Sequence, residues 1–202
     1  MDSAQGVDRG VSFFNSYRYR VVGEMTCNTS GMTRTGVRLR KLAWNPVGFA
    51  VVQHVLNHAR AYSVASFGHQ LTGVEGRKTF EMVYQNPQRA NGEIFAIESL
   101  GDTVVVAGFI TCSVREGAGY IHFLVVDERF RGQGIGGDAV KKLTQHLHHQ
   151  AKVVRLKVFP RNERTESFWL LQGFECVGEF DAESEKFAGS GLKYALFERA
   201  VD

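Results

Sequence analysis

The segment Arg131-Gly-Gln-Gly-Ile-Gly-Gly137 joins a short apolar stretch, Tyr120–Val126, to a longer amphipathic one, Ile135–Gln150. The apolar stretch is typical of a strand, and the amphipathic one repeats its apolar residues along one face of a helix. Glycines let the backbone approach a ligand closely, and the first turn of a helix offers unpaired N–H groups to an anion. The segment therefore predicts a loop that binds a phosphate or pyrophosphate.

The same glycines also match the dinucleotide-binding pattern G-x-G-x-x-G, at Gly132, Gly134 and Gly137. In that fold the glycines follow the strand directly, whereas Asp127–Arg131 intervenes here. The strands predicted before the loop also form an antiparallel meander and do not open a βαβ series. No G-K-[ST] follows, which excludes a nucleotide-triphosphate loop. A glycine turn with a purely structural role is the remaining alternative.

Turn residues divide the rest of the chain into further strands and helices. Strands are predicted at Phe13–Met25, Glu93–Leu100, Thr103–Arg115, Val153–Phe159, Phe174–Phe180 and Lys193–Val201, and helices at Asn45–Ala61, Val74–Tyr84 and Glu163–Gln172. Hairpin-like spacing makes the three strands between residues 93 and 126 antiparallel neighbours. The order of elements indicates a mixed α/β sheet, mainly antiparallel, with helices flanking it.

Composition favours an ordinary globular protein. The chain has 202 residues, of which 44% are hydrophobic and 22% charged. Its apolar runs are too short to cross a bilayer, and its polar N-terminus lacks the apolar region of a signal peptide. Its three cysteines are widely spaced and form no C-x-x-C pair. We expect a cytoplasmic protein in a reduced state with no membrane contact.

Basic residues gather near the N-terminus. Residues 1–41 carry seven Lys or Arg against three Asp or Glu, a net charge of +4, while the whole chain carries +3. We expect a basic extension over residues 1–41, which includes the first strand and joins residues 42–202 in one fold. The extension is either solvated or in contact with an acidic partner, and Arg34, Arg38, Arg40 and Lys41 are placed to meet an acidic acceptor.

Two motifs together make the chain resemble the GNAT family of N-acyltransferases. The acyl-CoA loop of that family has the form R/Q-x-x-G-x-G/A, which Arg131, Gly134 and Gly136 match. Family members often carry N-x-x-A-x-x-(L/F)-Y-x-x-x-G-F, and the segment Asn162–Phe174 reads NERTESFWLLQGF. The element order agrees from about Tyr17 to Val201, although the motifs cover only residues 120–174.

The resemblance implies that acetyl-CoA or another acyl-CoA binds where the central strands splay apart. Here the gap would lie between Tyr120–Val126 and Val153–Phe159. Backbone amides of the first strand would hold the pantetheine and polarise the thioester carbonyl, while the glycine loop and the helix dipole would hold the pyrophosphate. The implied binding residues are Leu124, Val125, Val126, Arg131, Gly132, Gln133, Gly134, Ile135, Gly136, Gly137, Asp138, Asn162, Phe168 and Trp169.

An amine would then attack the thioester directly, so candidates for proton transfer are needed. Where family members often place a tyrosine that protonates the leaving thiolate, this chain has Trp169. An indole N–H donates a hydrogen bond but is no useful acid near neutral pH, so we expect Trp169 to pack on the pantetheine arm. A hydrogen bond that stabilises the leaving sulfur is the alternative.

The base that accepts the amine proton is expected on the strand before the loop. Tyr120 and His122 share one face of that strand, opposite Ile121 and Phe123. His122 is the first candidate because imidazole titrates in the useful range, and a hydrogen-bonded core histidine is the alternative. Tyr120 and Glu98 are the next candidates.

His54 and His58 stand four residues apart in a predicted helix and so share a face. Zinc would need a further ligand, and neither H-E-x-x-H nor a third ligand is visible, so no metal is expected. The function expected from the resemblance is acetyl or acyl transfer from CoA to an amine of a protein or small molecule. The alternatives are a non-catalytic acyl-CoA-binding module and an enzyme that modifies nucleic acid through the basic extension; a homodimer is also considered.

Overall fold

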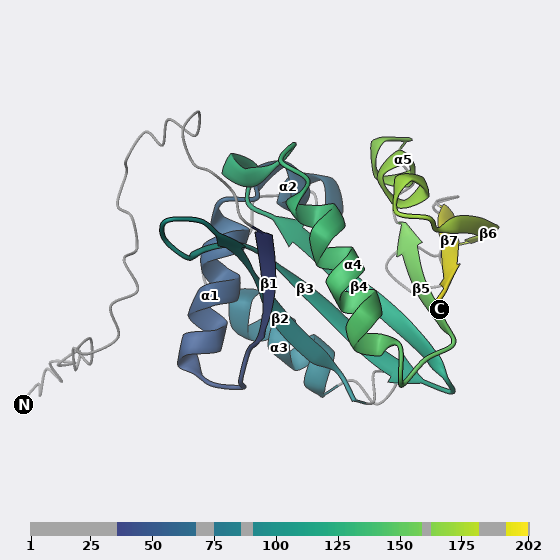
Figure 1. The fold of residues 1–202 in the computed structure, drawn as a ribbon, viewed down its shortest axis with the longest axis horizontal. Coiled ribbons are helices and arrows are strands. Elements are labelled where there is room, and N and C mark those ends of the chain that lie inside the picture. The colour runs from purple at the N-terminus through teal and green to yellow at the C-terminus, as the bar shows by residue number, and fades with distance from the viewer. Residues whose placement is uncertain (1–35, 68–74, 86–90, 159–162, 182–192, 202) are drawn as a thin grey trace, which may run out of the picture. The chain divides into compact units, whose positions relative to one another are not determined.

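A seven-stranded sheet runs through the computed structural model, which describes residues 36–67, 75–85, 91–158, 163–181 and 193–201 (Figure 1). The strand order is β1-β2-β3-β4-β5-β7-β6. The strands are β1 (Gly36–Lys41), β2 (Glu93–Leu100), β3 (Val105–Arg115), β4 (Ala118–Val126), β5 (Val153–Val158), β6 (Glu175–Asp181) and β7 (Lys193–Ala200). All neighbouring pairs are antiparallel except β4 and β5. The mixed, mainly antiparallel sheet is therefore confirmed.

Helices cover both faces of this sheet. They are α1 (Pro46–Asn57), α2 (Arg60–Phe67), α3 (Glu75–Tyr84), the 3₁₀ turn η3 (Glu128–Phe130), α4 (Ile135–Leu147) and α5 (Glu163–Leu171). Helix α4 crosses one face, and α1 and α3 lie behind the other (Figure 1). No helix within the described ranges is both long and apolar enough to span a membrane.

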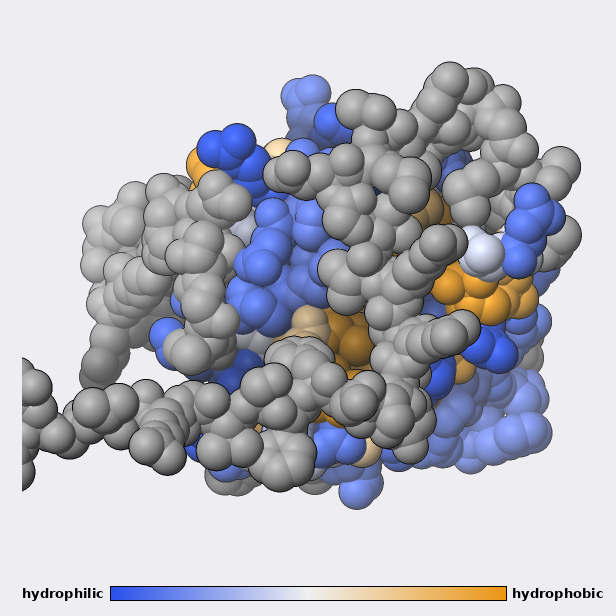
Figure 2. Space-filling view, turned by 90° about the vertical axis from the view of Figure 1, so that its left-hand side faces the viewer, coloured by the Kyte–Doolittle hydropathy of each residue, from blue (hydrophilic) through white to orange (hydrophobic). Residues whose placement is uncertain are grey.

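The two faces bury separate apolar clusters. On the α4 face, Ile110 and Ile121 pack with Leu143 of α4. On the opposite face, Phe109 packs with Val52 of α1 and Phe80 of α3. Each of these side chains is buried, and burying one contributes about 1.5–3 kcal/mol relative to exposure. Hydrophilic residues take up most of the described surface in the view of Figure 2, with smaller hydrophobic areas between them.

Strand β1 was not predicted from the sequence. It pairs with β2 from Gly36 opposite Leu100 to Lys41 opposite Phe95. Its alternating pattern sends Val37 and Leu39 to the α4 face, and Arg38 and Arg40 to the other face. The strand predicted at Phe13–Met25, like most of the basic extension, lies outside the described residues.

The basic cluster expected just before the first helix does not form one surface. Arg38 and Arg40 both bind Glu98, whereas Lys41 lies on the opposite face and binds Glu93. Alternation along an edge strand causes this separation, since successive side chains point to opposite faces. Arg34 is outside the described residues.

One helix predicted over Asn45–Ala61 is in fact two, so this prediction was wrong. Asn45 caps α1 by accepting a hydrogen bond from the Gly48 amide at 2.9 Å, as the Asn-Pro start suggested. The helix ends at Asn57, His58 leaves the helical conformation, and α2 begins at Arg60.

Candidate active site

The glycine loop lies between the end of β4 and the first turn of α4. Gly132 and Gly134 adopt φ angles of 73° and 75°, the left-handed region that costs other residues about 1–2 kcal/mol. Gly134 is the residue that precedes α4, and it has no side chain to cap the helix as Asn45 does in α1. The amides of the first turn are therefore presented without a side-chain cap, an arrangement suited to an anion.

In this loop the backbone amides, and not the side chains, are placed to bind an anion. Ile135 is buried in the core under α4, and the Gln133 side chain donates to the Arg129 carbonyl at 3.1 Å. Asp138 lies in the first turn of α4. A ligand on this turn would meet amides, and the carboxylate of Asp138 is the acidic group beside them.

Two glycines also let α5 approach the start of α4. A methyl group added at Gly136 would lie 3.4 Å from the Phe168 ring, and one at Gly137 would lie 2.8 Å from the Gln172 side-chain oxygen. Phe168, predicted as a binding residue, is thus beside the loop. Gln172 was not predicted, and only its helical spacing of four residues from Phe168 could have suggested it.

Strands β4 and β5 part next to this loop, as the resemblance implied. Their ladder runs from Ala118 opposite Val153 to Ile121 opposite Leu156. Strand β4 continues beyond this ladder to Val126, and β5 continues to Val158. The edge of β4 beyond Ile121 therefore faces a gap in the sheet.

Alternation decides which amides of β4 face the gap. The Phe123 amide donates to the Thr111 hydroxyl of β3 at 3.1 Å, and the Asp127 amide donates to the Ala107 carbonyl of β3 at 2.9 Å. In a strand successive N–H groups point to opposite edges, so the amides of Leu124 and Val126 point into the gap and that of Val125 points to β3. Two of the three predicted β4 amides are thus available to a ligand.

Arg131 lies at the mouth of this gap. Its Nε donates to the Val126 carbonyl at 3.2 Å, on the same edge as the Val126 amide. Its guanidinium is 3.7 Å from the Glu128 carboxylate. Arg131 therefore links the end of β4 to the glycine loop and places a positive charge between the two.

A bulge places His122 where β4 leaves β5. Cys112 pairs with Ile121 and Thr111 with Phe123, so His122 is the extra residue. The bulge puts Ile121 in the core on the α4 face and Phe123 on the α1 face, so the expectation that they share a face was wrong. His122 is half-buried, with Nε2 2.8 Å from the Ser113 hydroxyl, a partner that sequence reasoning missed.

Tyr120 lies in the paired part of β4, opposite Arg155 of β5. A hydrogen bond to Glu198, and after it one to Tyr120, raises the pKa of Arg155. Tyr120 is therefore tied to the closed part of the sheet, next to the point where the gap begins.

Glu98 lies two strands from β4 and is almost fully buried, with 4% of its side chain exposed. Arg38 Nη2 lies 2.6 Å from Oε2, and Arg40 Nε lies 2.5 Å from Oε1. Both carboxylate oxygens thus have cationic partners on β1, which favours a structural role over proton transfer.

Trp169 is the buried residue of α5, with 6% of its surface exposed. Its ring lies edge-on to Phe168 and Phe174, with centroids 5.0 and 5.2 Å away. These contacts belong to the core on the α4 face, so the ring packs on protein side chains, and its expected contact with the pantetheine arm stays a prediction. Asn162, the other predicted residue of this motif, is outside the described residues.

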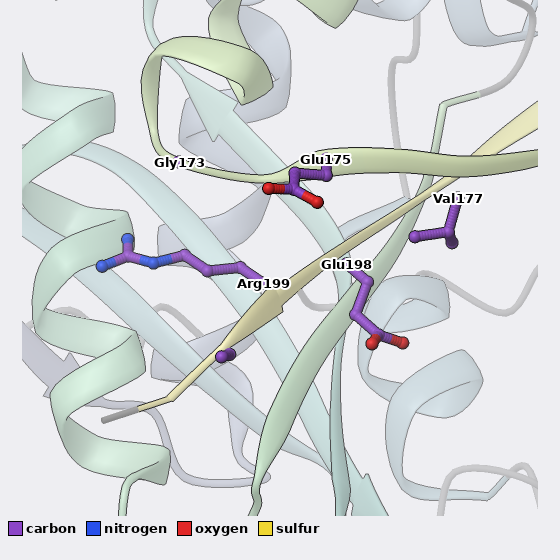
Figure 3. A pocket seen from close by; sticks show the side chains of 6 residues that line it. Gly173, Glu175, Val177, Glu198 and Arg199 are labelled. Atoms are coloured by element: carbon purple, nitrogen blue, oxygen red, sulfur yellow. The ribbon is translucent and has the colours of Figure 1, made fainter.

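A surface hollow of about 390 Å³ lies elsewhere, on the last two strands (Figure 3). The residues that line it are Gly173, Glu175, Val177, Glu198, Arg199 and Ala200. Arg199 donates to the Gln172 carbonyl at 2.8 Å and so closes the end of α5. None of the predicted binding residues lines this hollow, so it is separate from the glycine loop.

Comparison with known proteins agrees with this geometry. The sequence model of the acetyltransferase (GNAT) family matches residues 65–174, more than half of the chain. A curated spermine/spermidine N(1)-acetyltransferase of Bacillus subtilis is 31% identical over 74 residues, which are 36% of this chain and 49% of that protein. The chain thus matches about half the length of this relative.

Solved acetyltransferases share the fold. One of them, from Salmonella typhimurium, is described as modifying the N-terminal serine of ribosomal protein L7/L12. It is 18% identical to this chain, with a TM-score of 0.66, and the match covers 83% of this chain and 96% of the Salmonella chain. The microcin C7 self-immunity acetyltransferase MccE, solved with acetyl-CoA and AMP, is 16% identical with a TM-score of 0.64 over 83% and 93%. An acetyltransferase from Thermus thermophilus is 15% identical with a TM-score of 0.63 over 82% and 97%.

Proposed function

The chain belongs to the acetyltransferase (GNAT) family, and from this premise we propose that it transfers an acetyl group from acetyl-CoA to the amine of an acceptor. One observation carries the proposal: the gap between β4 and β5 opens directly beside an uncapped, glycine-rich helix start. A ligand with an extended amide-containing arm and a pyrophosphate fits such a combination. The coenzyme A thioester has both parts.

The pantetheine arm would bind to the free edge of β4 like an added strand. The amides of Leu124 and Val126, which alternation directs into the gap, would donate to it, as in other cases where an extended ligand extends a sheet. The pyrophosphate would then meet the amides from Gln133 to Gly137, with Arg131 between the two parts of the ligand. The predicted Asp138 amide is not available, because it donates to the Gly134 carbonyl at 3.1 Å. Phe168 would border the loop on the α5 side.

The chemistry is a direct displacement. The amine nitrogen forms a bond to the acetyl carbonyl carbon, and the carbon–sulfur bond then breaks to release CoA as a thiolate. An amide on the edge of β4 stabilises the negative charge that develops on the carbonyl oxygen. The proton lost by the amine goes to a base, and the thiolate takes a proton from the solvent, so no covalent enzyme intermediate is needed.

His122 is the base that the geometry favours. The bulge sets it at the first position of β4 beyond the ladder with β5, and the Ser113 hydroxyl orients its ring. Tyr120 stays within the ladder, and Glu98 is held by two arginines. Trp169 supports the site by packing and takes no part in proton transfer.

The acceptor is expected to be a small molecule or a protein amine. The described basic residues of β1 are engaged in ion pairs on two faces, so they supply no continuous surface for a nucleic acid. Amines to test include spermidine, which the name of the Bacillus relative suggests, and a peptide with a free N-terminal serine, which the name of the Salmonella structure suggests.

The test is the release of free CoA thiol from acetyl-CoA in the presence of each amine. Gly136→Glu is the informative variant, because it adds a negative charge beside the pyrophosphate position. Gly136→Ala is the matched control, since a methyl there would make only van der Waals contacts, 3.4 Å from the Phe168 ring and 3.8 Å from the Val126 side chain. We expect turnover in the wild type and the alanine variant and a large loss in the glutamate variant. Acetyl-CoA binding without turnover of any amine would instead support a binding module.

A further inference from the structure

Three potential metal ligands come together beside the glycine loop. His54 lies in the last turn of α1, His58 is the residue that follows this helix, and Asp127 follows β4. One ligand atom from each residue lies within 4.8 Å of those from the other two. The two histidines alone did not predict a site because a third ligand was missing. Asp127 becomes that ligand when α1 packs against the end of β4.

The contact between these two segments is built into the fold. The Glu128 amide donates to the His58 carbonyl at 3.2 Å, and the Glu128 carboxylate accepts a hydrogen bond from the Ala61 amide at 2.7 Å. These bonds fix the end of α1 beside Asp127. The three ligand atoms are therefore held near one another by backbone structure.

His58 is oriented as a metal ligand would be. Its Nδ1 lies 2.8 Å from the His54 carbonyl, and only a protonated nitrogen can bond to a carbonyl, so Nδ1 carries the hydrogen. The lone pair is then on Nε2, the atom left to coordinate. A histidine that ligates a metal almost always donates its other ring N–H to a carbonyl or carboxylate in this way.

Asp127 is fully buried, and its carboxylate is fixed by Arg129. Three donors of Arg129, the amide, Nε and Nη2, bond to the two oxygens. Because Nε bonds to both oxygens, four hydrogen bonds reach the roughly four acceptor sites, and a cation would bind by displacing one of the two shared Nε contacts. Carboxylates that ligate metals are typically hydrogen-bonded in this way. The positive charge of Arg129 repels a cation, so the site suits a metal that binds its ligands strongly and does not suit one that binds them weakly.

We propose that His54, His58 and Asp127 bind one Zn²⁺ ion, or a similar first-row divalent cation, and so join α1 to the segment between β4 and the glycine loop. Two imidazoles and one carboxylate suit zinc, whereas Mg²⁺ and Ca²⁺ prefer oxygen ligands alone. Bonds of about 2.0–2.2 Å require the ligand atoms to close to roughly 3.4 Å in a tetrahedral site. Small rotations of the half-buried His54 and the exposed His58 side chains, with the Nδ1 hydrogen bond of His58 kept, would provide this adjustment, and water would complete the site.

The test is calorimetric titration of the full chain, free of any affinity tag, with zinc chloride. His54→Ala/His58→Ala removes two ligands, and because His58 is exposed and His54 only half-buried, the fold should tolerate it. His148→Ala/His149→Ala is the matched control, since these exposed rings form another close pair, with centroids 4.7 Å apart. Asp127→Asn removes the carboxylate charge at nearly constant shape.

We expect one zinc per chain in the wild type and in the His148/His149 variant. Loss of two ligands should lower the association constant by more than the roughly 10- to 100-fold that loss of a supporting contact costs. Asp127→Asn should weaken binding as well, and circular dichroism should show that each variant is folded. Equal zinc binding by the wild type and the His54/His58 variant, or no stoichiometric binding by the wild type, would overturn the proposal. Neither outcome bears on acetyl transfer.

Discussion

Replacing Glu98 by glutamine should destabilise the fold without abolishing catalysis. The carboxylate is 4% exposed and meets Arg38 at 2.6 Å and Arg40 at 2.5 Å. Glutamine keeps the volume of the side chain, but its NH₂ group faces one guanidinium that needs an acceptor. The substitution therefore leaves one arginine poorly bonded and removes the negative charge between two positive ones.

The size of the effect follows from the exposure of the two arginines. Breaking a fully buried ion pair costs about 3–5 kcal/mol, and an exposed pair is worth about 0–1 kcal/mol. The side chains of Arg38 and Arg40 are 55% and 31% exposed, so water replaces part of the lost interaction. We expect a loss of about 1–3 kcal/mol, which for a domain of this size lowers Tm by roughly 3–10 °C.

Thermal unfolding followed by circular dichroism measures this change. Glu93→Gln is the matched control, because Glu93 lies on the same strand but is more exposed, with 17% of its side chain in contact with solvent. It should lose about 1 kcal/mol or less. The pH profile of kcat/KM for Glu98→Gln should keep its shape. An unchanged Tm together with a hundredfold loss of kcat and a lost ascending limb would show that Glu98 is the base.

Trp169→Phe should retain kcat within about tenfold in steady-state assays, because the ring packs in the core; a loss of about a hundredfold at unchanged CoA affinity would assign it a chemical role. His122→Ala should lower kcat/KM by about 10²–10⁴-fold and flatten the ascending limb of its pH profile, and an unchanged profile would direct attention to Tyr120 or a bound water. Burial acts to raise the pKa of Glu93, but hydrogen bonds from Lys41 and His146 lower it below 4.5, so the stability it confers is present above that pH and is lost as the pH falls through the lowered value. Urea unfolding at pH 6 and about pH 3 should therefore show a smaller acid loss in Glu93→Gln than in the wild type, and equal losses would contradict this.

The elements that the sequence predicted well are those with clear local signals. Strand Glu93–Leu100 was predicted with its observed bounds because Gly101 and Asp102 mark the turn after it. Helix α3 was predicted within one residue of its start. The gap between β4 and β5 was predicted only from the family resemblance, because the sequence of either strand alone does not indicate where their pairing stops.

The elements that it missed lack such signals or depend on distant contacts. The break between α1 and α2 contains neither glycine nor proline, so only the folded chain reveals it. In strand β1 the apolar Val37 and Leu39 alternate with Arg38 and Arg40, but the high density of basic residues led us to assign the segment to the basic extension. The bulge at His122 depends on register with β3, and the approach of Asp127 to His58 depends on tertiary packing.

The proposed function rests on where acetyl-CoA binds, and a crystal structure of the complex measures this directly. We expect pyrophosphate oxygens at about 2.7–3.2 Å from amides between Gln133 and Gly137. We also expect the pantetheine along the edge of β4, bonded to the amides of Leu124 and Val126, with the thioester near His122. Coenzyme bound in the hollow lined by Glu175 and Glu198, or any position that leaves the β4 edge unoccupied, would contradict the proposed function.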